Sequence, residues 1–245
     1  MDENNSIRHL HFDASYQSAL NLDNPLQMVF GYTSYLHLGA VAHPRPERAL
    51  FIGLGGGSAP AKFLHDYASL ARVDVVELDP DVIKVACRYF NVPDDPRLHL
   101  IQQDGRLYVE EKAREIAGGQ TLPYDLVVVD AYSSSTIPYH LATLEFFRSI
   151  RAVLAPDGVV ASNIIGAMAG PASRLLRAMT RTLGEVFPQV YLFPVGTVYS
   201  LADPFERNVV AIATMRPERW DEGSWRRKAE EMYAAGSIAE NVPEH

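Results

Sequence analysis

Cysteine, positive charge and long apolar stretches are all scarce in this 245-residue sequence. The single cysteine, Cys87, excludes a disulfide within the chain. It lies in a helical pattern, DVIKVACRYF, where we expect a buried, unreactive thiol. No apolar stretch approaches the ~20 residues of a membrane span, and the opening residues, MDENNSIRH, are too polar for a signal peptide. These absences predict a cytoplasmic protein that does not enter a membrane.

The charge balance is acidic, with 22 Lys and Arg against 30 Asp and Glu and a formal net charge of −8. Proteins that bind nucleic acid usually carry a basic surface, so we expect no nucleic-acid partner. A cationic small molecule is compatible with this charge. The eight histidines have no metal-ligand spacing; His9 and His11 alternate on a predicted strand, and we expect no metal site there.

The most informative stretch runs from Ala49 to Asp79 and combines a strand, a glycine turn, a helix and a second strand. The turn holds four glycines, Gly53, Gly55, Gly56 and Gly57. Glycines adopt positive φ and let a ligand approach the backbone, and the helix that follows presents unpaired N–H groups. The second strand ends at Glu77, where an acid is placed to accept both hydroxyls of a ribose. The stretch predicts a nucleoside-binding βαβ unit.

Ser58 distinguishes this turn from a dinucleotide-binding turn. It occupies the third glycine position of the pattern G-x-G-x-x-G, which makes an NAD-dependent oxidoreductase a distant alternative. A smaller, positively charged nucleoside such as S-adenosylmethionine fits the turn better. A tight strand-to-helix turn that binds no ligand is the structural alternative.

Five apolar strands alternate with helices along the chain, which predicts a mostly parallel sheet with helices on both faces. We expect these strands at residues 49–52, 73–76, 98–102, 126–129 and 159–165, and a closing antiparallel pair at 190–193 and 208–214. Other predicted elements are a hairpin at 7–12 and 16–20, a helix over 26–41 and an exposed helix over 224–235, capped by Asp221 or Ser224.

Polar residues stand at several strand ends, where ligands bind in parallel sheets. Asp104 and Gly105 follow the third strand, as a partner for an adenine amine, as a helix cap, or as both. Asp130 follows LVVV and is placed to hold an amine and accept its proton, or else to organise its own loop. Asn163 lies on the fifth strand. The polar loop 131–138 has the length and composition of a lid.

Several motifs resemble the spermidine synthases, or polyamine aminopropyltransferases, across residues 8–214. They are FDASYQSA, LFIGLGGGSAP, VDVVELDPDVI, DDPRLHLIQQDGR and YDLVVVDAYSSSTIPYHL. The resemblance implies a Rossmann-like class I S-adenosylmethionine methyltransferase fold, with a mostly parallel seven-stranded sheet and a short N-terminal β-hairpin region. It further implies aminopropyl transfer from decarboxylated S-adenosylmethionine to putrescine without a metal, and a homodimer formed through the hairpin. The expected division is 1–45, hairpin and helix; 46–215, nucleoside-binding domain; 216–245, helical tail.

The resemblance also assigns roles to individual residues. Asp130 and Tyr32 are implied as catalytic, with Asp130 holding and deprotonating the attacking amine and Tyr32 lining the junction of donor and acceptor. The residues expected to bind the donor, with Glu77 on the ribose and Asp104 on the adenine, are Gln17, Gly53, Gly55, Gly57, Ser58, Glu77, Asp104 and Gly105.

The sequence departs from the family at positions that bind amines. Ser58 replaces an aspartate that holds the donor's ammonium, and Ser133 replaces the second acid of the gate loop. Thr33 and Ser34 replace polar or acidic residues, and Phe193 replaces a tyrosine. Three functions stay open: an aminopropyltransferase acting on a small amine, a methyltransferase using S-adenosylmethionine itself, and a nucleoside-binding protein without catalysis.

Overall fold

The computed structural model describes residues 1–12, 15–132, 136–196 and 202–235, and it begins with a small antiparallel sheet. The sheet consists of β1 (Asp2–Asn4), β2 (Ile7–Phe12) and β3 (Ser15–Asn21). The predicted hairpin is confirmed in β2 and β3, whereas its turn at 13–14 lies outside the described residues. The three-residue strand β1 was not expected, because so short a strand has no alternating pattern to detect.

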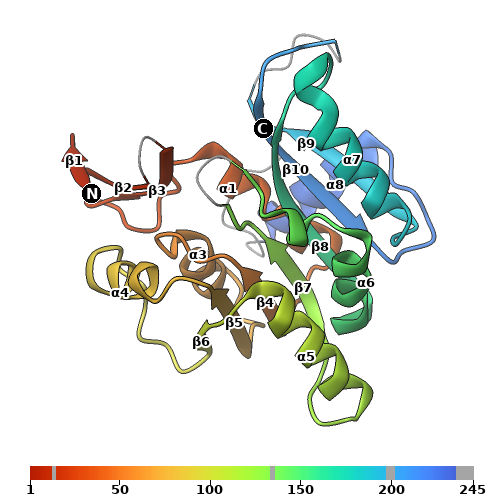
Figure 1. Cartoon of the computed structure of the whole chain (residues 1–245), viewed down its shortest axis with the longest axis horizontal. Coiled ribbons are helices and arrows are strands. Elements are labelled where there is room, and N and C mark those ends of the chain that lie inside the picture. The colour runs from red at the N-terminus through yellow and green to blue at the C-terminus, as the bar shows by residue number, and fades with distance from the viewer. Residues whose placement is uncertain (13–14, 133–135, 197–201, 236–245) are drawn as a thin grey trace.

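The central sheet has seven strands in the order β6-β5-β4-β7-β8-β10-β9 (Figure 1). They are β4 (Arg48–Ile52), β5 (Arg72–Glu77), β6 (Leu98–Gln102), β7 (Tyr124–Val129), β8 (Leu154–Gly166), β9 (Gln189–Pro194) and β10 (Arg207–Thr214). Neighbouring strands are parallel from β6 to β8, and β10 is antiparallel to both of its neighbours. The predicted mostly parallel, Rossmann-like sheet is confirmed.

Helices cover both faces of this sheet, because successive strand side chains point to opposite sides. Leu50 and Ile52 pack in one core with helices α5 (Gly105–Ala117), α6 (Leu144–Val153) and α7 (Arg174–Gly184). Ala49 and Phe51 pack in the other. The helices on that second face are α2 (Leu38–Ala42), α3 (Ser58–Asp66), α4 (Pro80–Tyr89) and α8 (Glu222–Ala234). The remaining helical pieces are α1 (Gly31–Tyr35), η1 (Tyr139–Leu141) and η2 (Pro171–Ser173).

The strand order places a crevice between β4 and β7. The chain leaves β4 toward β5 on one side and returns through β7 on the other, so the connections diverge at this point. Ligands of open α/β sheets bind outside the carboxyl ends of the strands at such a divergence. Gly53 follows β4 and Asp130 follows β7, so both residues lie at the crevice.

Three expectations about helices and burial were wrong. The single helix over 26–41 is two short helices, α1 and α2, because residues 28–30 run along a cavity before α1 begins. Cys87 is exposed, since α4 buries the face that carries Val82 and Ala86 instead.

The expectation of an exposed last helix was wrong for one of its faces. Trp225, Ala229 and Met232 lie at helical spacing on α8 and are buried against the second core. The expected cap is confirmed at Asp221, whose side chain accepts from the Ser224 amide at 2.8 Å. Within the described ranges, no helix combines the length and the apolar character needed to cross a bilayer.

A buried histidine lies below α3, away from the crevice. His37 is fully buried, its Nδ1 lies 2.7 Å from the Tyr67 hydroxyl, and its ring stacks on Phe63 with centroids 4.3 Å apart. Burial lowers the pKa of His37 to about 3; the nearby Asp66 carboxylate opposes this shift and Lys62 adds to it. The imidazole therefore stays neutral in the folded protein well below the pH at which it titrates in the unfolded chain.

This difference predicts acid sensitivity. The unfolded chain binds a proton at His37 near pH 6.5 and the folded chain does not, so stability falls as pH drops below that value. Between pH 7 and pH 5 we expect the loss at this site to be about 2 kcal/mol. The measurement is chemical denaturation of the protein and of His37→Asn at both pH values. His37→Asn should be less stable at pH 7 but lose less stability on acidification; equal losses in the two proteins would contradict the assignment.

Candidate active site

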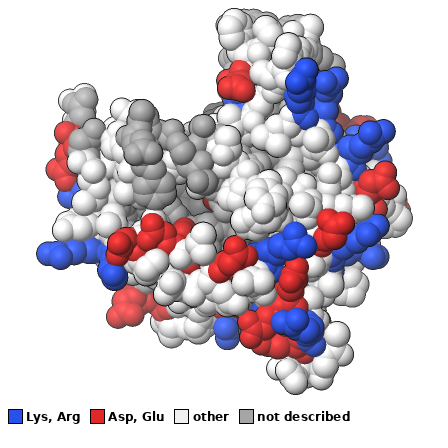
Figure 2. All heavy atoms as spheres, viewed as in Figure 1, with Lys and Arg blue, Asp and Glu red and all other residues white. Residues whose placement is uncertain are grey.

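A cavity of about 760 Å³ opens at the carboxyl edge of the sheet, between the N-terminal sheet and the loops that follow β4, β5, β6 and β7. This volume is within the range of small-molecule sites. Its described lining includes four carboxylates, Glu77, Asp79, Asp104 and Asp130, and no Lys or Arg. Figure 2 shows Asp and Glu in a row across the middle of this face, above α3 and α4, with Lys and Arg mostly toward its edges. The electrostatics favour a cationic ligand.

The glycine turn brings backbone close to backbone at the end of β4. Gly53 has φ +99°, and a Cβ at this position would lie 2.2 Å from the backbone oxygen of Asp130. The Gly53 amide donates to Val76, and the Asp130 amide donates to Ile52, so β4 is tied to both neighbours here. A side chain at Gly53 would push β4 and β7 apart and change the floor of the cavity.

Gly55 and Gly57 also have positive φ, +53° and +78°. Gly57 directly precedes α3, and a Cβ there would lie 2.5 Å from Val92. Ser58 is the first residue of α3; its hydroxyl donates to the Ala19 carbonyl at 3.4 Å and lines the cavity. The turn therefore places Gly55 and Ser58 beside the N-terminal sheet.

Glu77 supports the glycine turn and also lines the cavity. Its two carboxylate oxygens accept from the amides of Leu54 and Asp79, each at 3.0 Å. Each oxygen keeps a further lone pair for a ligand. The carboxylate is thus held in one orientation at the end of β5, which suits the predicted contact with a ribose.

Asp104 caps α5, which confirms the expectation of a helix cap at this position. Its Oδ1 accepts from the amides of Arg106 and Leu107, and its Oδ2 lies 3.2 Å from Nε2 of His140. Both Asp104 and Gly105 line the cavity. A Cβ at Gly105 would lie 2.6 Å from a methyl group of Ile52, so packing in the core already requires a glycine at this position.

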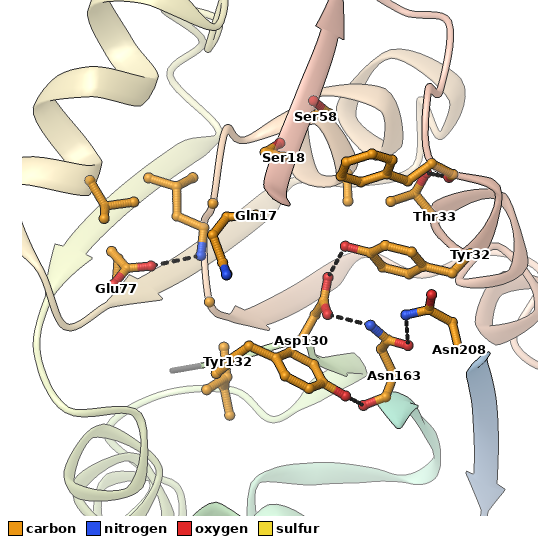
Figure 3. A pocket seen from close by; sticks show the side chains of 18 of the residues that line it. Gln17, Ser18, Tyr32, Thr33, Ser58, Glu77, Asp130, Tyr132, Asn163 and Asn208 are labelled. Atoms are coloured by element: carbon orange, nitrogen blue, oxygen red, sulfur yellow. Dashed lines mark hydrogen bonds between the residues drawn. The ribbon is translucent and has the colours of Figure 1, made fainter. Parts of the chain in front are cut away.

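Asp130 is the centre of a hydrogen-bond network (Figure 3). The Tyr32 hydroxyl donates to its Oδ2 at 3.0 Å, and Nδ2 of Asn163 donates to its Oδ1 at 2.9 Å. Nδ2 of Asn208 donates to Oδ1 of Asn163 at 3.0 Å, which fixes the end of the Asn163 amide that faces Asp130. The Tyr132 hydroxyl donates to the Asn163 carbonyl at 2.9 Å and accepts from the Ile165 amide.

Burial raises the pKa of Asp130 above its ordinary value, while the hydrogen bonds from Asn163 and Tyr32 lower it. Burial and the neighbouring carboxylate raise the pKa of Tyr32, so this hydroxyl stays protonated and acts as a donor. A carboxylate whose pKa is raised and whose orientation is fixed suits a proton acceptor. The alternative, in which Asp130 organises its own loop by capping Ser133 or Ser134, concerns residues that lie outside the described ranges.

The structure brings the predicted residues together. Every residue expected to be catalytic or to bind the donor lines this cavity except Gly57, which shapes the turn from behind. Gln17 and Ser18 reach it from β3. Phe193 does not line it: its ring packs on Trp225, with centroids 5.2 Å apart. Ser133 lies outside the described residues.

Asn208 and Tyr132 were missed by the sequence reasoning. Asn208 is the second residue of the antiparallel strand β10 and pairs with Ile165, so it reaches the carboxyl edge of the parallel strands from the opposite direction. The detectable signal was a polar residue at the beginning of a strand already predicted to be antiparallel. Tyr132 had no such signal, since its role depends on the path of the loop after Asp130.

The close approach at Gly53 predicts a strong effect of a single methyl group. Gly53→Ala adds a clash with the Asp130 carbonyl to the cost of positive φ, whereas Gly119→Ala has φ +69° and open space around its Cβ. We expect Gly119→Ala to cost ~1–2 kcal/mol and Gly53→Ala to cost at least ~2 kcal/mol more. Chemical denaturation measures both, and equal losses would show that the approach of β4 to β7 imposes no steric limit.

Known proteins resemble this chain in sequence and in fold. The model of the spermine/spermidine synthase domain matches residues 29–201. The chain is 32% identical over 169 residues to the polyamine aminopropyltransferase of Vibrio vulnificus, covering 69% of this chain and 53% of that protein. It is 31% identical over 193 residues to an N-terminal histidine N-methyltransferase of Emericella nidulans, covering 76% of this chain and 32% of that protein.

A solved structure of a probable spermidine synthase from Corynebacterium glutamicum has the same fold, with a TM-score of 0.75 at 19% identity, and covers 93% of this chain and 80% of that one. The chain spans about half the length of the Vibrio enzyme. The domain match covers well over half of the sequence, including the glycine turn, Glu77 and Asp130. This chain belongs to the spermine/spermidine synthase family.

Proposed function

We propose that this protein transfers an aminopropyl group from decarboxylated S-adenosylmethionine to a small amine. The observation that carries the proposal is Asp130, fixed by Tyr32 and Asn163 in a cavity lined by carboxylates and by no described Lys or Arg. Such a cavity suits the cations of both substrates, which are the sulfonium and aminopropyl ammonium of the donor and the ammonium of the acceptor. Family membership and the aminopropyltransferase relatives support the same reaction class.

Separate residues serve the two substrates in this proposal. Glu77 accepts the ribose hydroxyls, Asp104 accepts from the adenine amine, and Gly53 and Gly55 admit the nucleoside to the backbone. The donor supplies a carbon activated by its positive sulfur. Asp130 binds the acceptor ammonium and takes one of its protons, which frees the nitrogen lone pair for attack. Tyr32 and Asn163 hold the carboxylate in place for that transfer.

Methyl transfer from S-adenosylmethionine is the second candidate, and Ser58 favours it. A serine at this position does not repel a donor carboxylate as an acid would. Ser58 also begins a nine-residue helix whose N-terminal amides attract anions. An N-methyltransferase among the relatives agrees with this alternative. A non-catalytic nucleoside-binding protein stays a third possibility from the sequence, and a cytoplasmic location and a homodimer stay predictions.

Donor choice is tested by titrating S-adenosylmethionine, its decarboxylated form and methylthioadenosine, together with analysis of the nucleoside product. We expect the decarboxylated donor to bind more tightly and methylthioadenosine to accumulate with an amine. Formation of S-adenosylhomocysteine would show that the protein transfers a methyl group and would overturn the proposal of aminopropyl transfer. If neither methylthioadenosine nor S-adenosylhomocysteine forms with any amine tested, both transfer reactions are contradicted.

Asp130 and Glu77 should separate catalysis from nucleoside binding. Asp130→Asn removes the proton acceptor and should lower kcat at least ~100-fold while the affinity for methylthioadenosine is retained. Glu77→Gln should weaken that affinity ~10-fold or more, because it loses a charge-assisted bond to the ribose. Both are measured by calorimetric titration and steady-state kinetics. Unchanged turnover in Asp130→Asn would rule out its role as the base.

The hydrogen bond from Asn163 predicts a pH effect. Asn163 lowers the pKa of Asp130, so Asn163→Leu should raise that pKa and move the acidic limb of the kcat/KM profile to higher pH. Asn208→Leu, which removes only the support of the Asn163 amide, should shift the limb in the same direction by less. An acidic limb at the same pH in Asn163→Leu would show that another group controls it.

A further inference from the structure

The half of the cavity beyond Asp130 contains neutral groups. Figure 3 shows Asp130 in the middle, with Glu77 on one side of it and Asn163 and Asn208 on the other. From this arrangement, and resting on the proposed function, we propose that the acceptor is a monoamine: a primary amine with a single positive charge and an apolar remainder.

The other three carboxylates of the cavity already accept hydrogen bonds from backbone amides, on the side proposed for the donor. Glu77 accepts from two backbone amides of the glycine turn and its neighbourhood. Asp79 caps α4 through the Asp81 amide, and Asp104 caps α5. Asp79 and Asp104 stand at the starts of helices, and Glu77 stands at the end of β5 beside the glycine turn. Asp130 is therefore the single described carboxylate placed for an acceptor ammonium.

On the side of Asp130 away from Glu77, two amide side chains come first and an apolar side chain follows them. Asn163 contacts Asp130, Asn208 contacts Asn163, and the Val195 amide donates to the Asn208 carbonyl at 2.9 Å. Val195 lines the cavity and lies close to Gly31, next to Tyr32.

Phe30 and Ile165 complete this end, and both line the cavity. The Phe30 ring stacks on Tyr32 with centroids 6.3 Å apart. In the chain, Tyr132 is followed by Ser-Ser-Ser at 133–135 and Gly196 by Thr-Val-Tyr-Ser-Leu at 197–201, and neither stretch contains an acid.

A diamine would have to place its far ammonium among these neutral, half-buried groups. Asp203 and Glu206 are the acids nearest to Asn208 in the chain, and neither lines the cavity: Asp203 is paired with Arg207, and Glu206 is exposed. An ammonium buried without a counter-charge is strongly disfavoured. A monoamine of the same length places methyl and methylene groups there instead, and these gain from contact with Phe30, Ile165 and Val195.

The reaction of a monoamine balances with the residues present. The acceptor ammonium gives one proton to Asp130. The freed lone pair forms the new N–C bond while the C–S bond breaks, and sulfur keeps that bond's electron pair and becomes a neutral thioether. The product leaves with its new secondary amine protonated and with the primary ammonium that the aminopropyl group brought, and Asp130 returns its proton to solvent. No step needs a second carboxylate.

The test compares n-butylamine with 1,4-diaminobutane, which have equal length, at one pH and with saturating decarboxylated donor. We expect kcat/KM to be at least ~10-fold higher for the monoamine, given the penalty for an unpaired buried ammonium. Val195→Asp adds a carboxylate at the far end and should raise the ratio of diamine to monoamine at least ~10-fold. Val195→Asn has the same shape without the charge and should leave the ratio near that of the unmodified protein.

Calorimetric titration of both amines in the presence of methylthioadenosine reads the same preference without turnover. Tighter binding of the monoamine with no product from either amine would overturn the proposed reaction and support the acceptor class. Product formation with a preference for the diamine would overturn the acceptor class and leave the reaction standing. An unchanged ratio in a Val195→Asp protein that still unfolds cooperatively and binds methylthioadenosine would also overturn the acceptor class.

Discussion

The site depends on how closely β4 and β7 approach each other at their carboxyl ends. Gly53 has no Cβ, and one would lie 2.2 Å from the Asp130 carbonyl. The amide of Asp130 donates to Ile52, so the same few atoms that close the sheet also set the position of the Asp130 side chain. The glycine turn on one side and the carboxylate on the other are thereby placed by a single backbone contact, at the point where the strand connections diverge.

The carboxylates around this contact differ in the hydrogen-bond donors that they accept from, and this difference distinguishes two sides of the cavity. On the nucleoside side, carboxylates accept from backbone amides of turns and helix starts, as Glu77 and Asp104 do. On the other side, the hydrogen bonds that Asp130 accepts from described residues come from side chains, those of Tyr32 and Asn163. A carboxylate bound to backbone amides is fixed with the fold, whereas one bound to side chains is tuned by residues that can be exchanged without altering the sheet. Differences in acceptor and reaction within a family can arise on this second side while the nucleoside site is kept.

The relatives fit this division. The chain is about equally similar to an aminopropyltransferase and to an N-methyltransferase, at 32% and 31% identity. Ser58 and the neutral Asn163–Asn208 pair line the cavity, and in the proposed reaction they would face the ammonium groups of the donor and the acceptor. Both features reduce the number of cations that the cavity can hold, since each ammonium removed from water needs a counter-charge.

The sequence by itself determined the alternation of strands and helices, the glycine turn, and the acids at the ends of β5, β6 and β7, because these follow from periodicity and from residues adjacent in the chain. It did not determine the two short helices that replace the expected helix over 26–41, nor the burial of Trp225 on α8, because both depend on what packs against the segment. Only the tertiary structure decided that Tyr32, Asn163 and Asn208 meet at Asp130. These four residues are 33 or more positions apart in the chain, and the sheet order and the reversed direction of β10 bring them together.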